Sequence, residues 1–196
     1  MRHLLLATIL FAPSAFACEP HLLRLTTPEG AEDTTPVTVQ FTLRGTTLHT
    51  RFEVKTPSIA APEKIPAGSY PYQFDVVELF LSANGALPYF ELELSPYDET
   101  YFVKINDPQK PFLGGITLPV DHKVTRDQSG WVGELDIPLE SLGWRGDKAK
   151  LIGNAFAIQG VKPSRRYYSR SLPPQKKASF HQPAFFKPLL DCPLAQ

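Results

Sequence analysis

The chain has 196 residues, and its 20 lysines and arginines are balanced by 20 aspartates and glutamates, so its formal net charge is zero. A balanced chain has no long-range field that would gather it on nucleic acid or on an anionic membrane surface, and we exclude both as general partners. Its 20 prolines and single methionine favour a loop-rich β protein over a helical one.

The N-terminus shows the order of features that is typical of a secretory signal peptide. A basic start, Met1-Arg2-His3, precedes an apolar run from Leu4 to Ala12 and the small-x-small sequence Ala15-Phe16-Ala17. The apolar run is shorter than the about 20 residues that a membrane-spanning helix needs, and no later stretch reaches that length. We therefore predict a signal peptide over residues 1–17, one mature domain over residues 18–196 with no transmembrane segment, and a periplasmic or extracellular location.

Two cysteines mark the two ends of the mature chain. Cys18 would be its first residue, and Cys192 lies four residues from the end. A disulfide between them is expected in an oxidising compartment. A cysteine at the first mature position is also where a bacterial lipoprotein carries its lipid, so a lipid anchor at Cys18, on an outer-membrane lipoprotein, is the alternative.

Period-two alternation predicts the first strands. Apolar residues alternate with polar ones over residues 37–44 and again over residues 48–55, with Gly45-Thr46 between them. This pattern indicates an antiparallel hairpin with one solvated face. Residues 56–74 hold four prolines and are predicted to form a loop, which ends in the aromatic pair Tyr70 and Tyr72.

Further strands follow at short intervals. We expect a three-stranded meander over residues 75–82, 89–95 and 100–105, with Glu91 and Glu93 solvating one face of the second strand. A second hairpin is predicted over residues 123–126 and 131–137, and then one helical turn over residues 138–143. Residues 151–161 are apolar on both faces and indicate a central strand. Together these elements predict an all-β, single-domain antiparallel β-sandwich.

Several segments resemble the DOMON-like domains, and among these carbohydrate-binding module family 9. The matching segments are Asp75-x-x-Glu78-x-Phe80-Leu81, Pro88–Pro96, Gly130-Trp131 with Glu134 and Ile137-Pro138, Asn154 with Phe156, Arg165–Arg170, and Ser179–Phe186. They span about residues 22–190. The resemblance implies a β-sandwich that binds sugars or, in other branches, haem.

The resemblance also implies that aromatic rings hold the sugar, commonly tryptophans. This chain has two tryptophans, and Trp131 falls in a strand motif where it is expected to be core. We therefore transfer the stacking role to tyrosines, Tyr168 or Tyr167 and the Tyr70–Tyr72 loop, with arginines able to pair with an anionic sugar. The predicted ligand-binding residues are Tyr70, Tyr72, Asn154, Arg166, Tyr168 and Arg170. The predicted partner is a glycan, such as a cell-envelope or plant-type polysaccharide, bound without catalysis.

Two other functions stay open. A glycoside-processing enzyme would need a carboxylate pair, and Glu91 with Glu93 is the candidate, although no motif of a serine hydrolase or zinc protease occurs. A haem-binding DOMON-type domain could not use methionine, because Met1 is the single one, but a histidine or lysine could serve as ligand, for instance His181. The competing interpretation of His181 is a structural histidine whose ring bonds a backbone carbonyl.

A structural calcium ion is the one cofactor that we consider. Some relatives bind calcium structurally, and the carboxylates to check are Asp75 with Glu78, or Asp98 with Glu99. The sequence shows no spacing of carboxylates that is typical of a calcium-binding loop, so no metal ligand is assigned.

Overall fold

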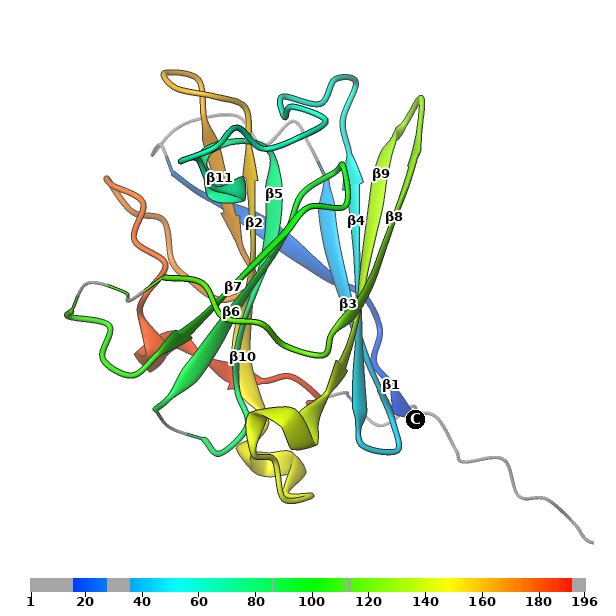
Figure 1. Cartoon of the computed structure of the whole chain (residues 1–196), viewed down its shortest axis with the longest axis vertical. Coiled ribbons are helices and arrows are strands. Elements are labelled where there is room, and N and C mark those ends of the chain that lie inside the picture. Colours follow the sequence, from blue (N-terminus) through cyan, green and yellow to red (C-terminus); the bar gives the residue numbers. More distant parts are fainter. Residues whose placement is uncertain (1–15, 28–35, 86, 111, 113, 192–196) are drawn as a thin grey trace, which may run out of the picture.

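Two antiparallel sheets face each other in the computed structural model, which describes residues 16–27, 36–85, 87–110, 112 and 114–191 (Figure 1). The first sheet contains β1 (Phe16–Ala17), β3 (Val37–Arg44), β4 (Thr47–Lys55), β8 (Asp121–Asp127) and β9 (Gly130–Pro138). The second contains β5 (Val76–Ser82), β6 (Tyr89–Leu94), β7 (Thr100–Ile105), β10 (Ile152–Gln159), β11 (Arg166–Ser169) and β12 (Lys187–Pro188).

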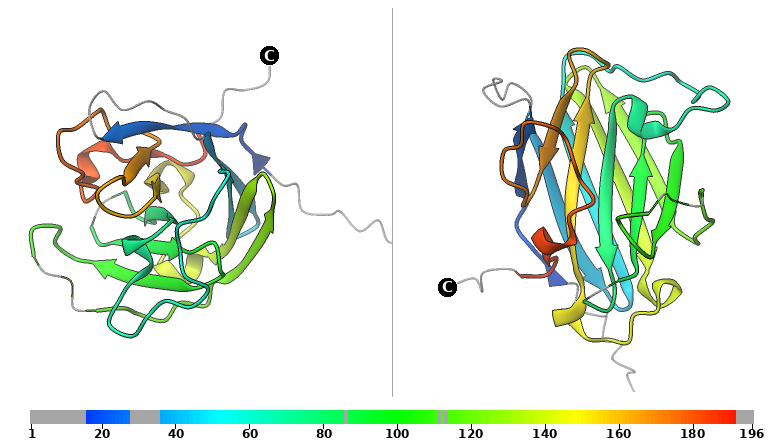
Figure 2. Two further views of the ribbon diagram at one scale, coloured as in Figure 1. Left: turned by 90° about the horizontal axis from the view of Figure 1, so that it is seen from above. Right: turned by 90° about the vertical axis from the view of Figure 1, so that its left-hand side faces the viewer.

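The two sheets are joined along one side by β2 (His21–Thr27). Its first half, His21–Leu23, pairs with β3, and its second half pairs with β11. The path of hydrogen-bonded neighbours therefore runs β7-β6-β5-β10-β11-β2-β3-β4-β9-β8 as one curled sheet. Seen from above, the strands curve around a common interior (Figure 2). The predicted all-β antiparallel sandwich is confirmed, and β2 closes one side of it.

Helical structure is limited to four short 3₁₀ segments in the described residues. These are η1 (Pro71–Gln73), η2 (Leu139–Leu142), η3 (Lys148–Lys150) and η4 (Pro183–Phe185). The segment η2 confirms the helical turn that was predicted over residues 138–143. In the part of the chain that the structure describes, no helix has the length and apolar character needed to cross a membrane.

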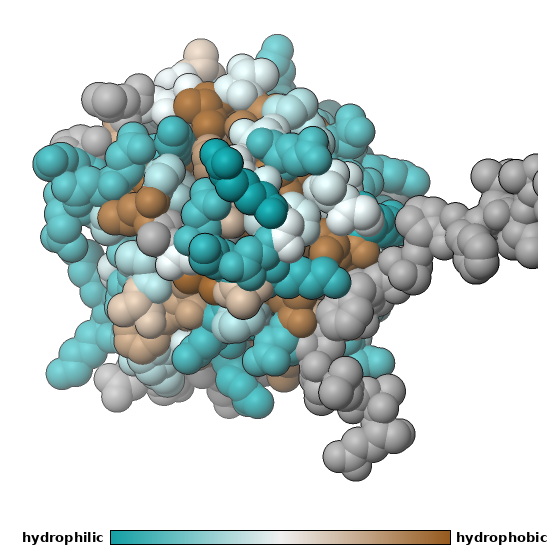
Figure 3. Space-filling view, turned by 90° about the horizontal axis from the view of Figure 1, so that it is seen from below, coloured by the Kyte–Doolittle hydropathy of each residue, from teal (hydrophilic) through white to brown (hydrophobic). Residues whose placement is uncertain are grey.

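The main hydrophobic core lies between the sheets and follows the predicted alternation. In the hairpin β3–β4, the buried residues Val37, Val39, Phe41, Leu48 and Phe52 point inward, as expected from their spacing. Trp131 is also part of this core, which confirms its structural role. The predicted central strand is β10, which pairs with β5 on one side and β11 on the other. On the end of the sandwich shown in Figure 3, hydrophobic and hydrophilic residues are interspersed.

A second apolar cluster lies on the outer face of the second sheet. Phe80, Tyr89 and Phe156 project from β5, β6 and β10 and are covered by Leu172 and Phe186 from the C-terminal part of the chain. Burial on both faces explains why every residue of β5 and β6 is buried. The outer face was expected to be solvated, and this expectation was wrong because the C-terminal segment packs across it.

The predicted processing site and disulfide are only partly within the described residues. Cys18 is buried, and its Sγ lies 3.8 Å from the carbonyl oxygen of Leu189. Cys192 lies outside the described residues, as do residues 1–15 of the predicted signal peptide. The signal peptide, the disulfide and the alternative lipid anchor therefore stay predictions.

Candidate functional site

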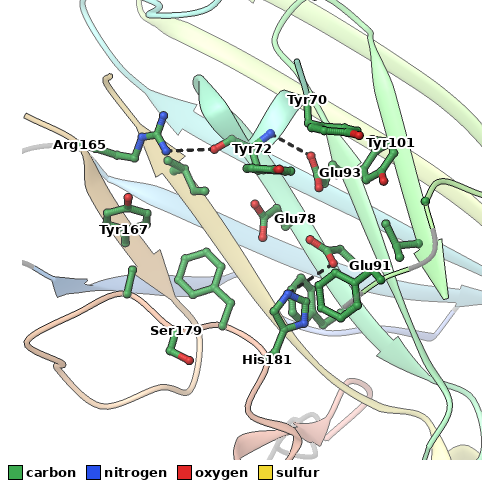
Figure 4. A pocket seen from close by; sticks show the side chains of 17 residues that line it. Tyr70, Tyr72, Glu78, Glu91, Glu93, Tyr101, Arg165, Tyr167, Ser179 and His181 are labelled. Carbon is green, nitrogen blue, oxygen red and sulfur yellow. Dashed lines mark hydrogen bonds and ion pairs between the residues drawn. The ribbon is translucent and has the colours of Figure 1, made fainter. Parts of the chain in front are cut away.

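A cavity of about 640 Å³ opens on the outer face of the second sheet, beside the C-terminal segment. Its volume falls in the range of about 300–1,000 Å³ that is usual for small-molecule sites. Three glutamates form its floor, and aromatic rings form its walls (Figure 4). The cavity is lined by residues of β5, β6, β7, β10 and β11, by the loop that contains η1, by Phe112 and Gly114, and by residues 178–181.

The floor carboxylates are brought together by strand geometry. Side chains alternate between the two faces of a strand, so Glu91 and Glu93 of β6 share the outer face with Glu78 of β5. The register places Glu78 opposite Glu93, and Phe80 opposite Glu91. One carboxylate oxygen from each glutamate lies within 4.8 Å of the others. Their exposed fractions are only 2%, 6% and 0% for Glu78, Glu91 and Glu93.

Burial raises the pKa of all three carboxyl groups. For Glu91, loss of solvent raises the pKa to about 7. For Glu78 and Glu93, loss of solvent and then the neighbouring carboxylates hold the pKa well above the usual range. Three buried acids so close together do not all ionise without a counter-charge. Near neutral pH the floor therefore holds protons and can both donate and accept hydrogen bonds.

One wall of the pocket consists of tyrosines. The rings of Tyr70 and Tyr72 are stacked with their centroids 5.4 Å apart and an interplanar angle of 7°, and Tyr101 of β7 packs against Tyr70 at 4.9 Å. Tyr70 and Tyr72 are about two-fifths exposed, so their rings are available to a ligand. The backbone N–H of Tyr72 donates to Glu93 Oε2 at 2.9 Å, which ties this wall to the floor.

The opposite wall comes from β11 and the C-terminal segment. Tyr167 meets Phe180 edge-to-face, with centroids 5.9 Å apart. Phe180 in turn stacks on Phe156 of β10 at 4.2 Å, which fixes it to the sheet. Figure 4 shows Tyr167 on one side, the cluster of Tyr70, Tyr72 and Tyr101 on another, and the carboxylates between them.

His181 completes the rim beside Glu91. Its Nδ1 shares a 2.8 Å hydrogen bond with the Tyr89 hydroxyl, and its Nε2 lies 3.7 Å from Glu91 Oε2. Burial lowers the pKa of His181 to about 4, so the ring is neutral near pH 7. The predicted structural histidine is thus hydrogen-bonded, but to a tyrosine hydroxyl; the predicted backbone carbonyl partner was wrong.

Arg165 fastens the loop of η1 to the turn between β10 and β11. Its Nη1 donates to the Tyr72 carbonyl oxygen at 3.3 Å, and its Nη2 donates to the carbonyl oxygen of Gln73. The guanidinium also lies near enough to Glu78 to oppose the rise in the pKa of that carboxyl. Arg165 therefore positions the tyrosine wall rather than covering the floor.

The structure brings together only part of the predicted ligand-binding set. Tyr70 and Tyr72 line the cavity, and Tyr167, the stated alternative to Tyr168, lines it too. Tyr168 is fully buried between the sheets, because neighbours on β11 point to opposite faces. The remaining predicted residues lie away from the cavity.

Each of these remaining residues has a different place. Asn154 is fully buried, with its Oδ1 accepting a 3.3 Å hydrogen bond from Ser169. Arg166 lines a smaller hollow beside Asp75, and Arg170 donates to the Pro188 carbonyl oxygen at 2.9 Å. We therefore remove Asn154, Arg166, Tyr168 and Arg170 from the candidate site, because no part of their side chains lines the pocket.

Other lining residues were not predicted as ligand-binding, namely Glu78, Glu91, Glu93, Tyr101, Arg165, Phe180 and His181. The expectation that Glu91 and Glu93 solvate the sheet was wrong, since both are buried. The sequence does contain an indication of Glu91 and Glu93 as site residues, because these two glutamates lie on the same face of the strand as the aromatic Tyr89. That signal needs the covering C-terminal segment before it indicates a pocket.

The carboxylate pairs considered for calcium have other partners. Asp75 is used internally, accepting hydrogen bonds from the backbone N–H groups of Ala60 at 2.8 Å and Gly160 at 2.6 Å. Asp98 pairs with His122 at 2.9 Å. Glu78 faces Glu91 and Glu93 rather than Asp75.

Comparison with known sequences gives distant relatives. No family model matches the chain. The UPF0462 protein C4orf33 homolog of Rattus norvegicus is 27% identical over 124 residues, which cover 60% of this chain and 59% of that protein. The Mus musculus homolog is 28% identical over 123 residues, covering 60% and 61%. The match thus spans about three fifths of the length of these relatives.

The matches to solved structures cover more of the chain than the matches to sequence relatives do. A candidate carbohydrate-binding protein from Bacteroides uniformis superposes with a TM-score of 0.70 at 16% identity, covering 86% of this chain and 84% of that one. A family 9 carbohydrate-binding module from Caldicellulosiruptor kristjanssonii, in complex with cellotriose, gives a TM-score of 0.59 at 17% identity, covering 88% and 79%. The fold is like that of family 9 carbohydrate-binding modules. A further structure of that kind from the same organism, in complex with glucose, gives a TM-score of 0.57 at 16% identity, covering 87% and 81%. The expected family 9-like fold is therefore confirmed.

Proposed function

We propose that this protein binds a saccharide, without cleaving it, in the pocket on the outer face of the second sheet. The observation that carries the proposal is the placement of aromatic walls, with Tyr72 on one and Tyr167 on the other, around three buried carboxyl groups. The likeness of the fold to modules solved with cellotriose and glucose adds support.

Aromatic rings and carboxyl groups match the two kinds of surface that a sugar presents. The C–H faces of a pyranose are apolar and pack on aromatic rings, as in other apolar pockets with a few placed polar groups. Tyr70 and Tyr72 offer nearly parallel rings that are partly exposed. The hydroxyl groups of the sugar would meet the carboxyl groups of the floor, which accept hydrogen bonds and, when protonated, also donate them.

The arrangement of the carboxyl groups on one floor favours binding over hydrolysis. Glycosidases use two carboxyl groups on either side of the scissile bond, about 5–5.5 Å apart in retaining enzymes and about 6.5–9.5 Å apart in inverting ones. Here Glu78, Glu91 and Glu93 lie side by side on one floor, with their oxygens within 4.8 Å. They do not flank a space between them.

The acidic floor of the pocket also disfavours haem binding. His181, the candidate axial ligand, has its Nδ1 bonded to Tyr89 and its Nε2 beside Glu91. A porphyrin presents a large apolar face and two anionic propionates, so it would bury apolar surface against three acids. The residues of this pocket do not fit that group.

We further propose that the protein is exported and binds a glycan of a cell envelope or a plant-type polysaccharide. The support is the N-terminal pattern of residues 1–17 together with the family 9-like fold. The polymer is to be identified by screening. Candidates are oligosaccharides of plant cell walls and soluble fragments of bacterial envelopes.

The test is a glycan screen followed by calorimetric titration of the ligands that bind. Tyr72→Ala and Tyr167→Ala remove one ring from each wall, and each is expected to weaken binding about tenfold or more, which is about 1.4 kcal/mol. Tyr97→Ala is the matched control, because Tyr97 lies outside the pocket, with its ring against Arg126. Equal affinity of all three variants for the glycan would show that the saccharide does not bind in this pocket. If no glycan binds, the proposed saccharide-binding function is wrong.

A further inference from the structure

We propose that Glu78, Glu91 and Glu93 form a binding site for one divalent cation of the oxygen-ligand class, such as Ca²⁺ or Mn²⁺. The site would occupy the floor of the pocket. It is argued from the positions of the three carboxylates, independently of the proposed saccharide binding.

The geometry of the three carboxylates suits a single ion. Calcium binds oxygen ligands at about 2.3–2.6 Å, so two oxygens on one ion lie no more than about 5 Å apart. One oxygen from each glutamate lies within 4.8 Å of the other two. The adjacent antiparallel strands β5 and β6 hold these residues in register, so the sheet itself brings the three carboxylates together.

Buried carboxyl groups with few hydrogen-bond partners are the second observation that points to a ligand. Glu93 is fully buried, its Oε2 accepts a hydrogen bond from Tyr72, and the one interaction left to its Oε1 is a proton shared with the neighbouring carboxyl group of Glu91. Glu78 is 2% exposed, no described residue donates a hydrogen bond to it, and its carboxylate faces the middle of the pocket (Figure 4). Buried acceptors of this kind are normally satisfied by protein, water or an ion.

The guanidinium of Arg165 lies near enough to Glu78 to oppose the rise of its pKa, but no described cationic side chain is hydrogen-bonded to the floor carboxylates. Arg165 directs its guanidinium N–H groups to the carbonyl oxygens of Tyr72 and Gln73. His181 is held by Tyr89 through Nδ1, and its Nε2 is 3.7 Å from Glu91. A bound cation would thus neutralise the negative charge of the three carboxylates, which the surrounding residues do not neutralise.

The ligand atoms select the class of metal. Three carboxylates are hard oxygen donors, which suit Ca²⁺ and Mn²⁺, whereas zinc sites usually include histidine nitrogen or cysteine sulfur. Three glutamates offer at most six oxygens, and the side facing the cavity stays open. Water, or the hydroxyl groups of a bound sugar, would complete the coordination there.

The test uses the full chain after treatment with EDTA and without any sugar. Terbium(III) serves as the probe, because light absorbed by nearby tyrosines such as Tyr72 and Tyr101 sensitises its luminescence. We expect a saturable terbium signal that excess Ca²⁺ displaces, and a melting temperature that rises by several degrees in Ca²⁺ or Mn²⁺, as binding to the native state requires.

Glu78→Gln and Glu93→Gln are expected to weaken terbium and Ca²⁺ binding at least tenfold and to abolish the thermal shift. Glu63→Gln, at an exposed position outside the pocket, is the matched control and should behave as wild type. Circular dichroism in EDTA verifies folding, and Glu91→Gln serves if one variant fails to fold.

The proposal is overturned if wild type gives neither terbium luminescence nor a Ca²⁺ or Mn²⁺ shift at millimolar concentrations. It is also overturned if Glu78→Gln and Glu93→Gln respond as wild type does. Glycan titrations in EDTA are scored separately, so failure of the metal site and failure of saccharide binding are distinguishable.

Discussion

The backbone N–H of Tyr72 donates a 2.9 Å hydrogen bond to Glu93 Oε2, and this contact joins the tyrosine wall of the pocket to its acidic floor. Glu93 lies on β6, whereas Tyr72 belongs to the η1 segment that precedes β5. A loop rich in proline is thereby anchored to the sheet at the residue that bears an exposed ring. The position of the aromatic wall therefore depends on a buried carboxylate.

Replacing Glu93 tests this dependence. Glu93→Gln keeps an oxygen that can accept from Tyr72, whereas Glu93→Leu leaves the N–H without its acceptor. We expect Glu93→Leu to lower the free energy of unfolding by about 1–3 kcal/mol relative to Glu93→Gln. Denaturant unfolding in EDTA measures the difference, and equal stability of the two variants would show that the hydrogen bond does not anchor the loop.

The pH dependence of stability is expected to reflect Glu91. Burial raises the pKa of Glu91 from its ordinary value of 4.5 to about 7 in the native state, so the folded protein holds this proton more tightly than the unfolded chain. Its contribution is complete below pH 4.5 and is lost as pH rises through about 7. The loss approaches about 3 kcal/mol, from about 1.4 kcal/mol for each pH unit.

Glu91→Gln isolates that contribution, because the uncharged amide does not titrate. Urea unfolding between pH 5 and pH 8 in EDTA should show a flatter stability profile for the variant than for wild type. The raised pKa values of Glu78 and Glu93 change the free energy of unfolding with pH in the same direction as that of Glu91. The pKa of His181 is lowered to about 4, so its contribution to the stability of the protein is lost as pH falls. Parallel profiles for wild type and Glu91→Gln would contradict the raised pKa.

The strands could be predicted from the sequence because alternation is a local signal. The hairpin β3–β4 and the meander β5–β6–β7 were predicted within a few residues of their observed bounds. The strands β2 and β11 were not predicted. Each is short or irregular, and β2 divides its pairing between two sheets.

The pocket depends on tertiary relations that a pattern does not contain. The choice between Tyr167 and Tyr168 is one case, since neighbours on a strand face opposite ways and only the pairing of Ile158 with Tyr167 decides which faces outward. Burial of Glu93 is another, because it requires the η1 loop to lie against β6, where the backbone N–H of Tyr72 bonds the carboxylate. Tyr70 and Tyr72 could be selected as candidates because a loop ending in aromatics is visible locally; both line the cavity, and their binding of a ligand stays a prediction.

Arg165 is expected to contribute to ligand affinity through the tyrosine wall. Arg165→Met removes the hydrogen bonds to the carbonyl oxygens of Tyr72 and Gln73, and we expect saccharide affinity to fall about fivefold, which corresponds to about 1 kcal/mol. Arg166→Met is the control, since the neighbouring side chain lines a different hollow. Titration calorimetry compares the two, and a larger effect for Arg166→Met would place the site elsewhere.

The predicted disulfide can be tested by intact mass. Cys18 is buried beside Leu189, three residues before Cys192 in the sequence. We expect the mass of the mature protein to rise by two hydrogen atoms when a reductant supplies two electrons and two protons, and Cys18→Ser to lower the free energy of unfolding by about 2–5 kcal/mol. Cys192→Ser should match Cys18→Ser, and the double variant should lose no more. An added diacylglycerol mass would instead support a lipid anchor.

Because the C-terminal segment covers β5 and β6, the sheets can form before the pocket is complete. Every strand from β2 to β11 precedes Phe180 and His181 in the chain, so the sheets can assemble on the emerging polypeptide before those two residues are available. Until they dock, the acids and phenylalanines of the outer face are open to water. Ligand affinity would therefore report that synthesis and docking of this last region are complete.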